Sequence, residues 1–232
     1  MSSFLRGALP SPRHRLASAI PHAVTTLTPP QFLWLPVRLS MWGNATYGDC
    51  TVAEEAFAKG ATDGLFVSDE EVIAWARQNG AINGDTLVDV LDKMQTEGFP
   101  VNGKTYDDGP FTSVNWMDPA ALKNAIFHGP VKLGVAAAQL QNSVPEPPVN
   151  GWFVTGFVED KNLDHCVSLC GYGPVQWLAQ RLGANAPDLV DSAATAYALF
   201  TWGSIGIITP ESVVAITGEA WLRNPTTVIK EN

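Results

Sequence analysis

The chain is short of cysteine, of basic residues and of long apolar runs, and each shortage excludes a class of protein. Three cysteines in 232 residues are too few for a disulfide framework, and their odd number favours a reducing compartment. Lys and Arg number 14 against 23 Asp and Glu, a formal net charge of −9, which excludes nucleic acid as an expected partner. No run reaches the roughly 18 apolar residues that a spanning helix needs, so no membrane partner is expected.

The composition supplies ample material for a folded core. Hydrophobic residues make up 46% of the chain and charged residues 16%, a balance typical of a globular protein. The length fits one domain or two small lobes that share an interface. Residues 1–20 carry basic side chains but no long apolar segment of the kind found in secretory signals, so we expect a cytoplasmic protein.

The first forty residues are rich in proline, which removes a backbone donor and breaks regular elements. Residues 1–40 are therefore predicted to form an extended arm that lies on a folded body. The apolar residues expected to anchor this arm by burial are Phe32, Leu33, Trp34 and Leu35. Beyond the arm, the patterns predict a helical lobe over residues 41–110 and a β-rich lobe over residues 111–232.

Apolar residues recur at helical spacing in the first half of the body and in short strand-like runs in the second. Helices are predicted from Cys50 to about Gly60, from Ser68 with Glu71 at capping-box spacing, from Asp85 to Glu97, and from Asp118 to Gly129. Strands are predicted over residues 131–137, 152–158, 166–171, 197–202 and 205–209, with an insertion and a short helix at 174–192. Helices followed by strands indicate an α+β fold with a cleft between two lobes.

Cys50 is the first candidate for chemistry because it follows Tyr47-Gly48-Asp49 and leads directly into a predicted helix. The unpaired N–H groups and the dipole at a helix N-terminus favour a thiolate, which is the nucleophilic form of cysteine. A small, buried, apolar side chain is the alternative, since most free cysteines are buried. Position alone leaves the two interpretations equally open.

His165 is the second candidate, at the start of a strand that is otherwise apolar. Strand alternation sends it to the face opposite Cys166. A histidine that opens a strand beside a cleft can act as a general base, and a histidine buried in the core is the alternative. His14 and His22 belong to the arm, and His128 lies at a helix C-terminus, where a cation is stabilising for structural reasons.

No cofactor and no metal are predicted. Cys166 and Cys170 lie four strand residues apart, about 13 Å, which is too far for a disulfide. The chain also lacks further Cys or His ligands at zinc-site spacing, so both cysteines are expected in the core. The adjacent carboxylates at positions 54–55 and 107–108 are expected to be solvated, and no glycine-rich phosphate loop is present.

Four segments together resemble the papain-like cysteine peptidase superfamily, over roughly residues 30–215. In the order that this family has them, the segments are NATYGDC at 44–50, GPV at 129–131, DHCVSLCGYG at 164–173 and FTWG at 200–203. The resemblance implies a papain-like α+β fold with an N-terminal helical lobe, a C-terminal antiparallel β-barrel-like lobe and an active-site cleft between them.

The resemblance also implies roles for individual residues. Cys50 is the expected nucleophile, and it would form a thiolate–imidazolium pair with His165 across the cleft. The Asn44 side chain and the Cys50 backbone N–H would hold the oxyanion. Gly48 occupies a position where the family has glycine, and Trp202 would cover the histidine.

The departures from the family pattern concern the same segments. Asn44 replaces a glutamine, Tyr47 stands where many members have a disulfide cysteine, and Thr51 replaces a tryptophan. Phe200 occupies the position of the asparagine that orients the histidine, and it accepts no hydrogen bond.

A substitute for that asparagine is not obvious in the sequence. Strand alternation is expected to turn Thr201 away from His165, and Asp164 leaves the opposite face of its strand. The orienting group is therefore expected to be a backbone carbonyl, a water or a residue from a distant loop. No inhibitory pro-domain is recognisable before the nucleophile segment.

These features predict a cysteine-dependent acyl-transfer enzyme, most simply a peptidase or amidase that forms a covalent acyl-enzyme. Its expected substrate is a peptide or a small amide or thioester. One alternative is transfer of the acyl group to an amine, as in an acyltransferase, cyclase or transpeptidase. A catalytically impaired papain-like binding module is the other, motivated by Phe200.

Overall fold

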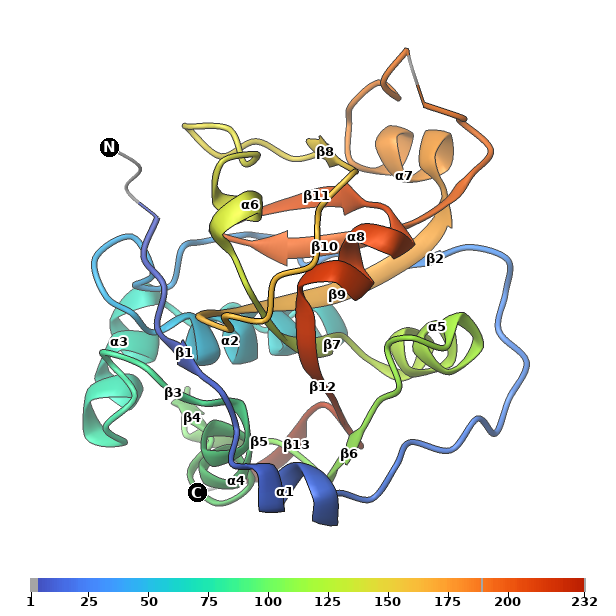
Figure 1. Ribbon diagram of the computed structural model, residues 1–232. Coiled ribbons are helices and arrows are strands. Elements are labelled where there is room, and N and C mark those ends of the chain that lie inside the picture. The colour runs from blue at the N-terminus through green and yellow to red at the C-terminus, as the bar shows by residue number, and fades with distance from the viewer. Residues whose placement is uncertain (1–3, 189, 232) are drawn as a thin grey trace.

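The computed structural model of the chain describes residues 4–188 and 190–231, and its elements form an α+β fold (Figure 1). The helices are α1 Arg13–Ser18, α2 Cys50–Asp63, α3 Asp69–Gln78, α4 Leu87–Glu97, α5 Pro119–His128, α6 Ala138–Gln141, α7 Val175–Arg181 and α8 Pro210–Ile216. The strands are β1 Ala8–Leu9, β2 Phe32–Leu33, β3 Asp85–Thr86, β4 Phe99–Val101, β5 Lys104–Asp107, β6 Phe111–Ser113, β7 Val131–Val135, β8 Phe153–Val154, β9 His165–Pro174, β10 Thr195–Thr201, β11 Ser204–Ile208, β12 Thr217–Arg223 and β13 Val228–Glu231. None of the helices among the described residues is both long and apolar enough to cross a membrane.

The main sheet is built around β9, whose neighbours are β7 and β10. Its strand order is β6-β12-β7-β9-β10-β11-β8, and β2 pairs with β9 outside this path. No pairing between the described residues links β6 to β8, so the sheet is open. The predicted α+β layout is confirmed, whereas the barrel-like closure of the β-rich lobe is not observed.

The core lies on both faces of this sheet, because the side chains of β9 and β10 alternate between them. Val167 and Leu169 contact the cluster under α5 and α8, whereas Cys170 and Phe200 contact the cluster under α2. Figure 1 shows α2 crossing behind β9, which brings the start of the helix near the start of the strand.

Local signals placed most helices where the sequence predicted them. Ser68 Oγ accepts the Glu71 N–H at 3.2 Å and Glu71 Oε2 accepts the Ser68 N–H at 2.8 Å, which completes the predicted capping box of α3. Asp118 caps α5, and Pro119 is its first residue. The strand predicted over 152–158 is reduced to Phe153–Val154, and the arm, predicted to be extended, contains the helix α1. The elements α8, β12 and β13 were not predicted either.

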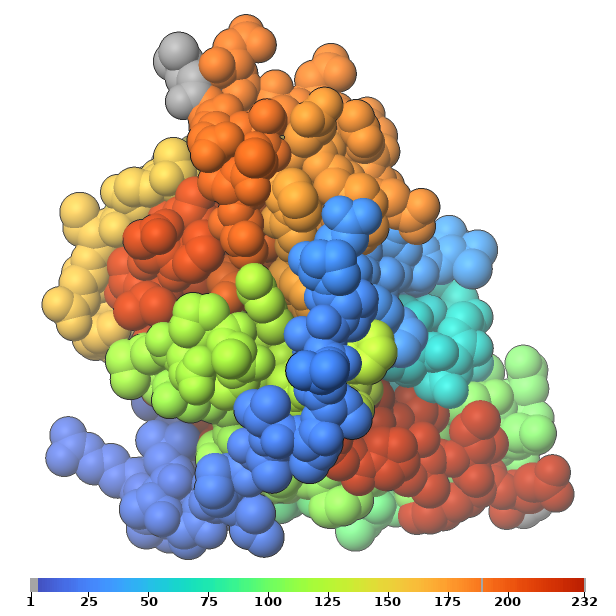
Figure 2. Space-filling view, turned by 90° about the vertical axis from the view of Figure 1, so that its right-hand side faces the viewer, coloured from blue at the N-terminus to red at the C-terminus, as the bar shows by residue number. Residues whose placement is uncertain are grey.

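The N-terminal arm wraps around the body. In Figure 1 it descends in front of α2 to α1 and then follows the outside of the molecule to β2, and Figure 2 shows it lying against α5. Trp34 Nε1 donates to the Ile126 carbonyl at 2.8 Å, so this part of the arm is anchored to α5. Of the residues expected to be buried, Phe32, Leu33 and Trp34 are half-buried and Leu35 is 37% exposed. Phe4, which no pattern singled out, is 4% exposed.

The expectation that the two carboxylate pairs are solvated is wrong. Glu54, Glu55, Asp107 and Asp108 are all buried, because cations that are distant in the sequence pair with them. Arg223 Nη1 lies 2.8 Å from Glu54 Oε2 and 2.6 Å from Glu55 Oε2. A buried charge needs such a partner, and Arg223 lies about 170 positions from both glutamates in the chain.

The buried charges form one network between α2 and the sheet. Lys132 of β7 pairs with Glu55 and lies 3.2 Å from Glu54, and Lys59 pairs with Asp108. Burial raises the pKa of Glu55, but the cations around it, led by Arg223, lower that pKa more strongly, so the net shift is downward. The network ties the helix that begins at Cys50 to the strands beside it.

Candidate active site

Cys50 is the first residue of α2, and its thiol is buried at 2% exposure. Ala8 of the arm and Cys166 of β9 pack with it in one buried cluster. Burial raises the pKa of the thiol to about 11, against a partial lowering of that pKa by the backbone amides of Cys166, Gly7 and Ala8. The thiol is therefore protonated at neutral pH in this covered arrangement.

His165 is the first residue of β9, and its ring is held on two sides. Its Nε2 lies 2.8 Å from Thr201 Oγ1. The indole of Trp202 stacks on the ring, with centroids 4.2 Å apart and planes at 13°. Burial, together with the charge of Arg6, lowers the pKa of His165 to about 3, so the imidazole is neutral. Its Nδ1 has no hydrogen-bond partner among the described residues.

Thr201 was expected to turn away from His165, and this expectation is wrong. Phe200 pairs with Ser168 across the sheet and faces α2, where its ring stacks on Phe57 at 4.1 Å. Thr201 consequently projects to the opposite face, which is also the face of His165. The strand register, rather than a one-to-one match with the family asparagine, decides which side chain reaches the histidine.

Asn44 lies in the loop before α2 and is 2% exposed. Its Nδ2 donates to the Tyr47 carbonyl at 3.1 Å, which fixes the amide and leaves its second N–H for another acceptor. Gly48 lies directly against Gly7 of the arm, because a Cβ at Gly7 would lie 1.8 Å from the Gly48 carbonyl oxygen. The loop thus accommodates a second backbone segment directly against it.

That second segment is the arm. Leu5 donates its N–H to the Asn44 carbonyl at 3.4 Å and accepts the Trp202 Nε1–H at 2.9 Å, so it bridges the two sides of the site. Ala8 donates to the Asp164 carbonyl at 3.2 Å, and β1 pairs in parallel with β3 at Asp85. Residues 4–11 therefore lie across the start of α2 and the start of β9, and we call the space that they fill the groove.

The arm meets the thiol in a way that does not set up acyl transfer. Nucleophilic attack requires a carbonyl carbon at the sulfur, with its oxygen held by the oxyanion donors. The Gly7 carbonyl oxygen instead lies toward Gly84, where a Cβ would come within 2.2 Å of it. The covered site therefore holds a neutral thiol and a neutral imidazole.

The remaining cysteines lie in the core. Cys166 and Cys170 are 3% and 0% exposed, and all three cysteines are free. The Cys170 thiol donates to the Ala198 carbonyl at 3.6 Å, and burial raises its pKa well above the ordinary value. Within residues 4–188 and 190–231, no cluster of three His, Cys, Asp or Glu side chains could hold a metal ion.

Solved cysteine proteases share this architecture. The proform of Amb a 11, a ragweed pollen allergen, aligns with a TM-score of 0.62 at 13% identity, over 91% of this chain and 73% of that one. Xylellain, a cysteine protease from Xylella fastidiosa, aligns with a TM-score of 0.58 at 13% identity over 96% of each chain. A Carica candamarcensis cysteine protease solved with E-64 aligns with a TM-score of 0.57 at 16% identity, over 84% of this chain and 98% of that one.

These neighbours establish that the chain has the papain-like fold, as the resemblance of its sequence segments implied. No family model matches the sequence, and no curated protein matches it. The identities of 13–16% are too low to carry an activity from one protein to another, so the chemistry is argued from the residues of this chain.

Proposed function

We propose that the chain is a cysteine peptidase or amidase that acts through Cys50 and His165. The packing of Cys50 with Cys166 in one buried cluster carries the proposal, because it brings the start of α2 against the residue that follows His165. Thr201 and Trp202 support it, since a hydrogen bond and a stacked ring orient the imidazole with Nδ1 unpaired.

The proposed reaction begins once the arm leaves the groove. Water then reaches the site, which removes the desolvation that holds the thiol and the imidazole neutral. The Cys50 proton passes to His165, and the thiolate attacks the substrate carbonyl. The free N–H of the Asn44 amide and the Cys50 backbone N–H hold the oxyanion. His165 gives its proton to the leaving amine, and water releases the acyl group from the sulfur.

Peptides or small amides and thioesters are the proposed substrates, and the three unpaired cysteines support a reducing, cytoplasmic setting. Transfer of the acyl group to an amine uses the same acyl-enzyme and differs only in the group that captures it. Product mass distinguishes hydrolysis from such transfer.

The test is selective alkylation of the full-length protein, read by mass spectrometry of each cysteine. Cys50 is expected to react faster than the other two thiols, and Cys50→Ala is expected to abolish both this labelling and any amide turnover. Cys170→Ala is the matched control, since it removes a buried thiol outside the groove. If Cys50→Ala leaves labelling and turnover unchanged, Cys50 is structural and the chain is a binding module.

A further inference from the structure

The arm and the body carry charge of opposite sign. The first 48 positions contain no acidic residue and four arginines, at positions 6, 13, 15 and 38. All 23 acidic residues lie beyond them. The segment that fills the groove is therefore basic, and the surface that receives it belongs to an acidic body.

Two arginines of the arm bind carboxylates along its path. The Arg6 guanidinium pairs with Asp164, and Arg15 Nη2 lies 2.6 Å from Asp92 Oδ2. All four side chains are about a third or more exposed, so salt screens these pairs and each one contributes little by itself. A carboxylate that binds a basic segment more strongly has to be buried, where water and salt screen its charge less.

Glu219 of β12 is such a carboxylate, at 2% exposure. Its Oε1 accepts the Ser11 N–H of the arm at 3.0 Å, and its Oε2 accepts the Trp221 indole N–H at 2.8 Å. The facing residue of β7 is Gly134, where a Cβ would lie 2.8 Å from Glu219 Cγ, so the glycine makes room for the side chain. When the arm leaves, Oε1 loses the Ser11 donor while Oε2 stays fixed.

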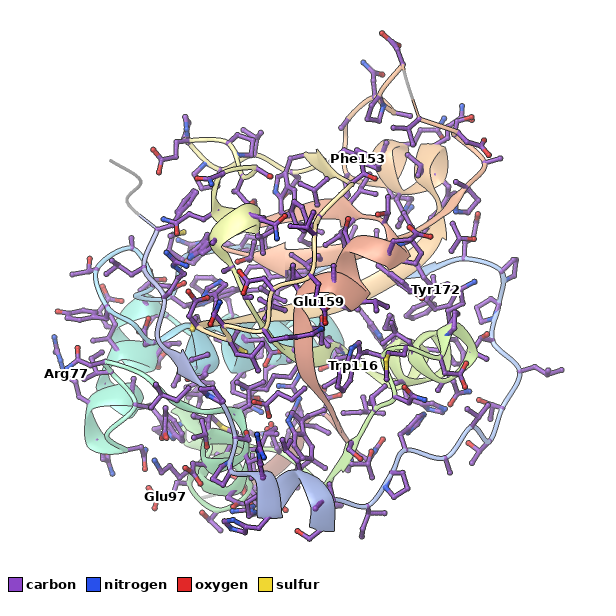
Figure 3. The ribbon with its side chains drawn as sticks, viewed as in Figure 1. Arg77, Glu97, Trp116, Phe153, Glu159 and Tyr172 are labelled. Atoms are coloured by element: carbon purple, nitrogen blue, oxygen red, sulfur yellow. The ribbon has the colours of Figure 1, made fainter. Side chains whose placement is uncertain are left out.

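A cavity of about 300 Å³ adjoins this carboxylate. Trp116 and Trp221 form part of its wall, and Figure 3 shows Trp116 beside β12. Leu16, Pro21 and His22 of the arm close it from outside, so it opens further when the arm leaves. Glu219 is the one carboxylate among its described lining residues. Aromatic walls with one carboxylate suit a side chain with an apolar stem and a cationic end.

We infer that the groove, once the arm leaves, selects extended basic peptides, with Glu219 binding the cationic end of a Lys or Arg side chain. This inference rests on the proposed function, because it names the substrate class of the same groove. Ser11 lies three residues beyond Ala8, about 10 Å along an extended chain, so the basic residue lies within a few positions of the bond that faces Cys50. A cation there replaces the donor that Ser11 supplied, with a charge-assisted hydrogen bond.

The test measures peptide binding rather than turnover, so it stands apart from the activity of the site. The full chain with Gly7→Ala and Cys50→Ala is used, because the first change obstructs the seat of the arm and the second prevents acyl transfer. Fluorescence anisotropy compares extended peptides that are otherwise uncharged and carry Arg, Gln or Glu at one and the same position. We expect the Arg peptide to bind at least about 10-fold tighter than the Gln peptide.

Glu219→Gln keeps the size of the side chain and removes its charge. It is expected to reduce the preference for Arg over Gln to about twofold or less, while the affinity for the Gln peptide stays unchanged. Glu159→Gln, at an exposed carboxylate, is the control that should leave the preference intact. If the Gly7→Ala, Cys50→Ala protein with Glu219 intact binds the Arg and Gln peptides equally, or does not bind the Arg peptide, the inference is overturned. This outcome does not depend on how the Glu219→Gln protein behaves. Peptide binding without any turnover by the Cys50-containing protein contradicts the proposed function alone.

Discussion

Thr201 Oγ1 lies 2.8 Å from His165 Nε2, so a hydroxyl holds one ring nitrogen while Nδ1 has no hydrogen-bond partner among the described residues. Both residues are buried, at 1% exposure each. Phe200, one position earlier, lies in the core on the other face of the sheet. The orienting group is thus a near neighbour of the position where the family has asparagine.

Thr201→Val removes this hydroxyl with little change in volume. We expect kcat/KM for an amide substrate to fall by about 10- to 150-fold, the loss expected for one hydrogen bond to a charged partner. Thr201→Ser should retain most of the rate because it keeps the hydroxyl. Thr195→Val, at the exposed start of β10, is the matched control. A rate unchanged in Thr201→Val would show that Trp202 alone orients the ring.

Phe200→Asn does not restore an orienting group, because residue 200 faces Phe57 and Trp42. The substitution places an amide in an aromatic cluster and leaves a cavity. We expect it to lower the free energy of unfolding by about 3–5 kcal/mol, measured by urea denaturation. Phe200→Leu should cost less. An Asn variant that is as stable as the parent and reacts faster at Cys50 would place residue 200 in the groove.

Gly7→Ala is expected to displace the arm, because its Cβ would lie 1.8 Å from the Gly48 carbonyl oxygen and the backbone cannot yield that far. Alkylation of Cys50 by a small neutral reagent should then accelerate by at least about 10-fold at pH 8. Leu27→Ala, at an arm residue that is 98% exposed, is the control and should leave the rate unchanged. Equal rates in the parent and Gly7→Ala would mean that the arm does not limit access.

The pH dependence of alkylation should report the covered thiol. Burial raises the Cys50 pKa from 9.0 to about 11, so the thiolate fraction of the parent protein rises only as pH approaches 11. In Gly7→Ala, where water reaches the sulfur, the alkylation profile should shift to lower pH. The measurement is the rate at each pH from 6 to 11, with Cys50→Ala as the blank. An identical profile in both proteins would contradict this account.

Lys132→Met should destabilise the protein strongly. It removes the cation that pairs with Glu55 and leaves a buried carboxylate with fewer partners, so we expect a loss of about 3–5 kcal/mol in the free energy of unfolding. Lys161→Met is the control, because its side chain is 53% exposed, and it should change stability by less than about 0.5 kcal/mol. Similar losses for the two variants would show that the network is solvated in solution.

Local signals were sufficient where neighbours in sequence make the structure. Ser68 and Glu71 cap α3 with each other, and Asp118 with Pro119 starts α5, so spacing alone predicted these helices. Cys50 begins α2 and His165 begins β9, as their positions before periodic segments indicated. The strand over 152–158 failed for the opposite reason, since only Phe153–Val154 finds a partner in β11.

By itself, the sequence determined the α+β class, the helix that begins at Cys50 and the strand that begins at His165, because periodicity and capping act within a few residues. Only the tertiary structure decided that Thr201 reaches His165, that Arg223 neutralises Glu54, and that the arm covers the thiol. Each of these contacts joins segments at least 36 positions apart, and the pairing register of β9 and β10 and the packing of α2 on the sheet bring them together. A one-residue change in that register would turn every side chain of the strand to its other face, which no local pattern can reveal.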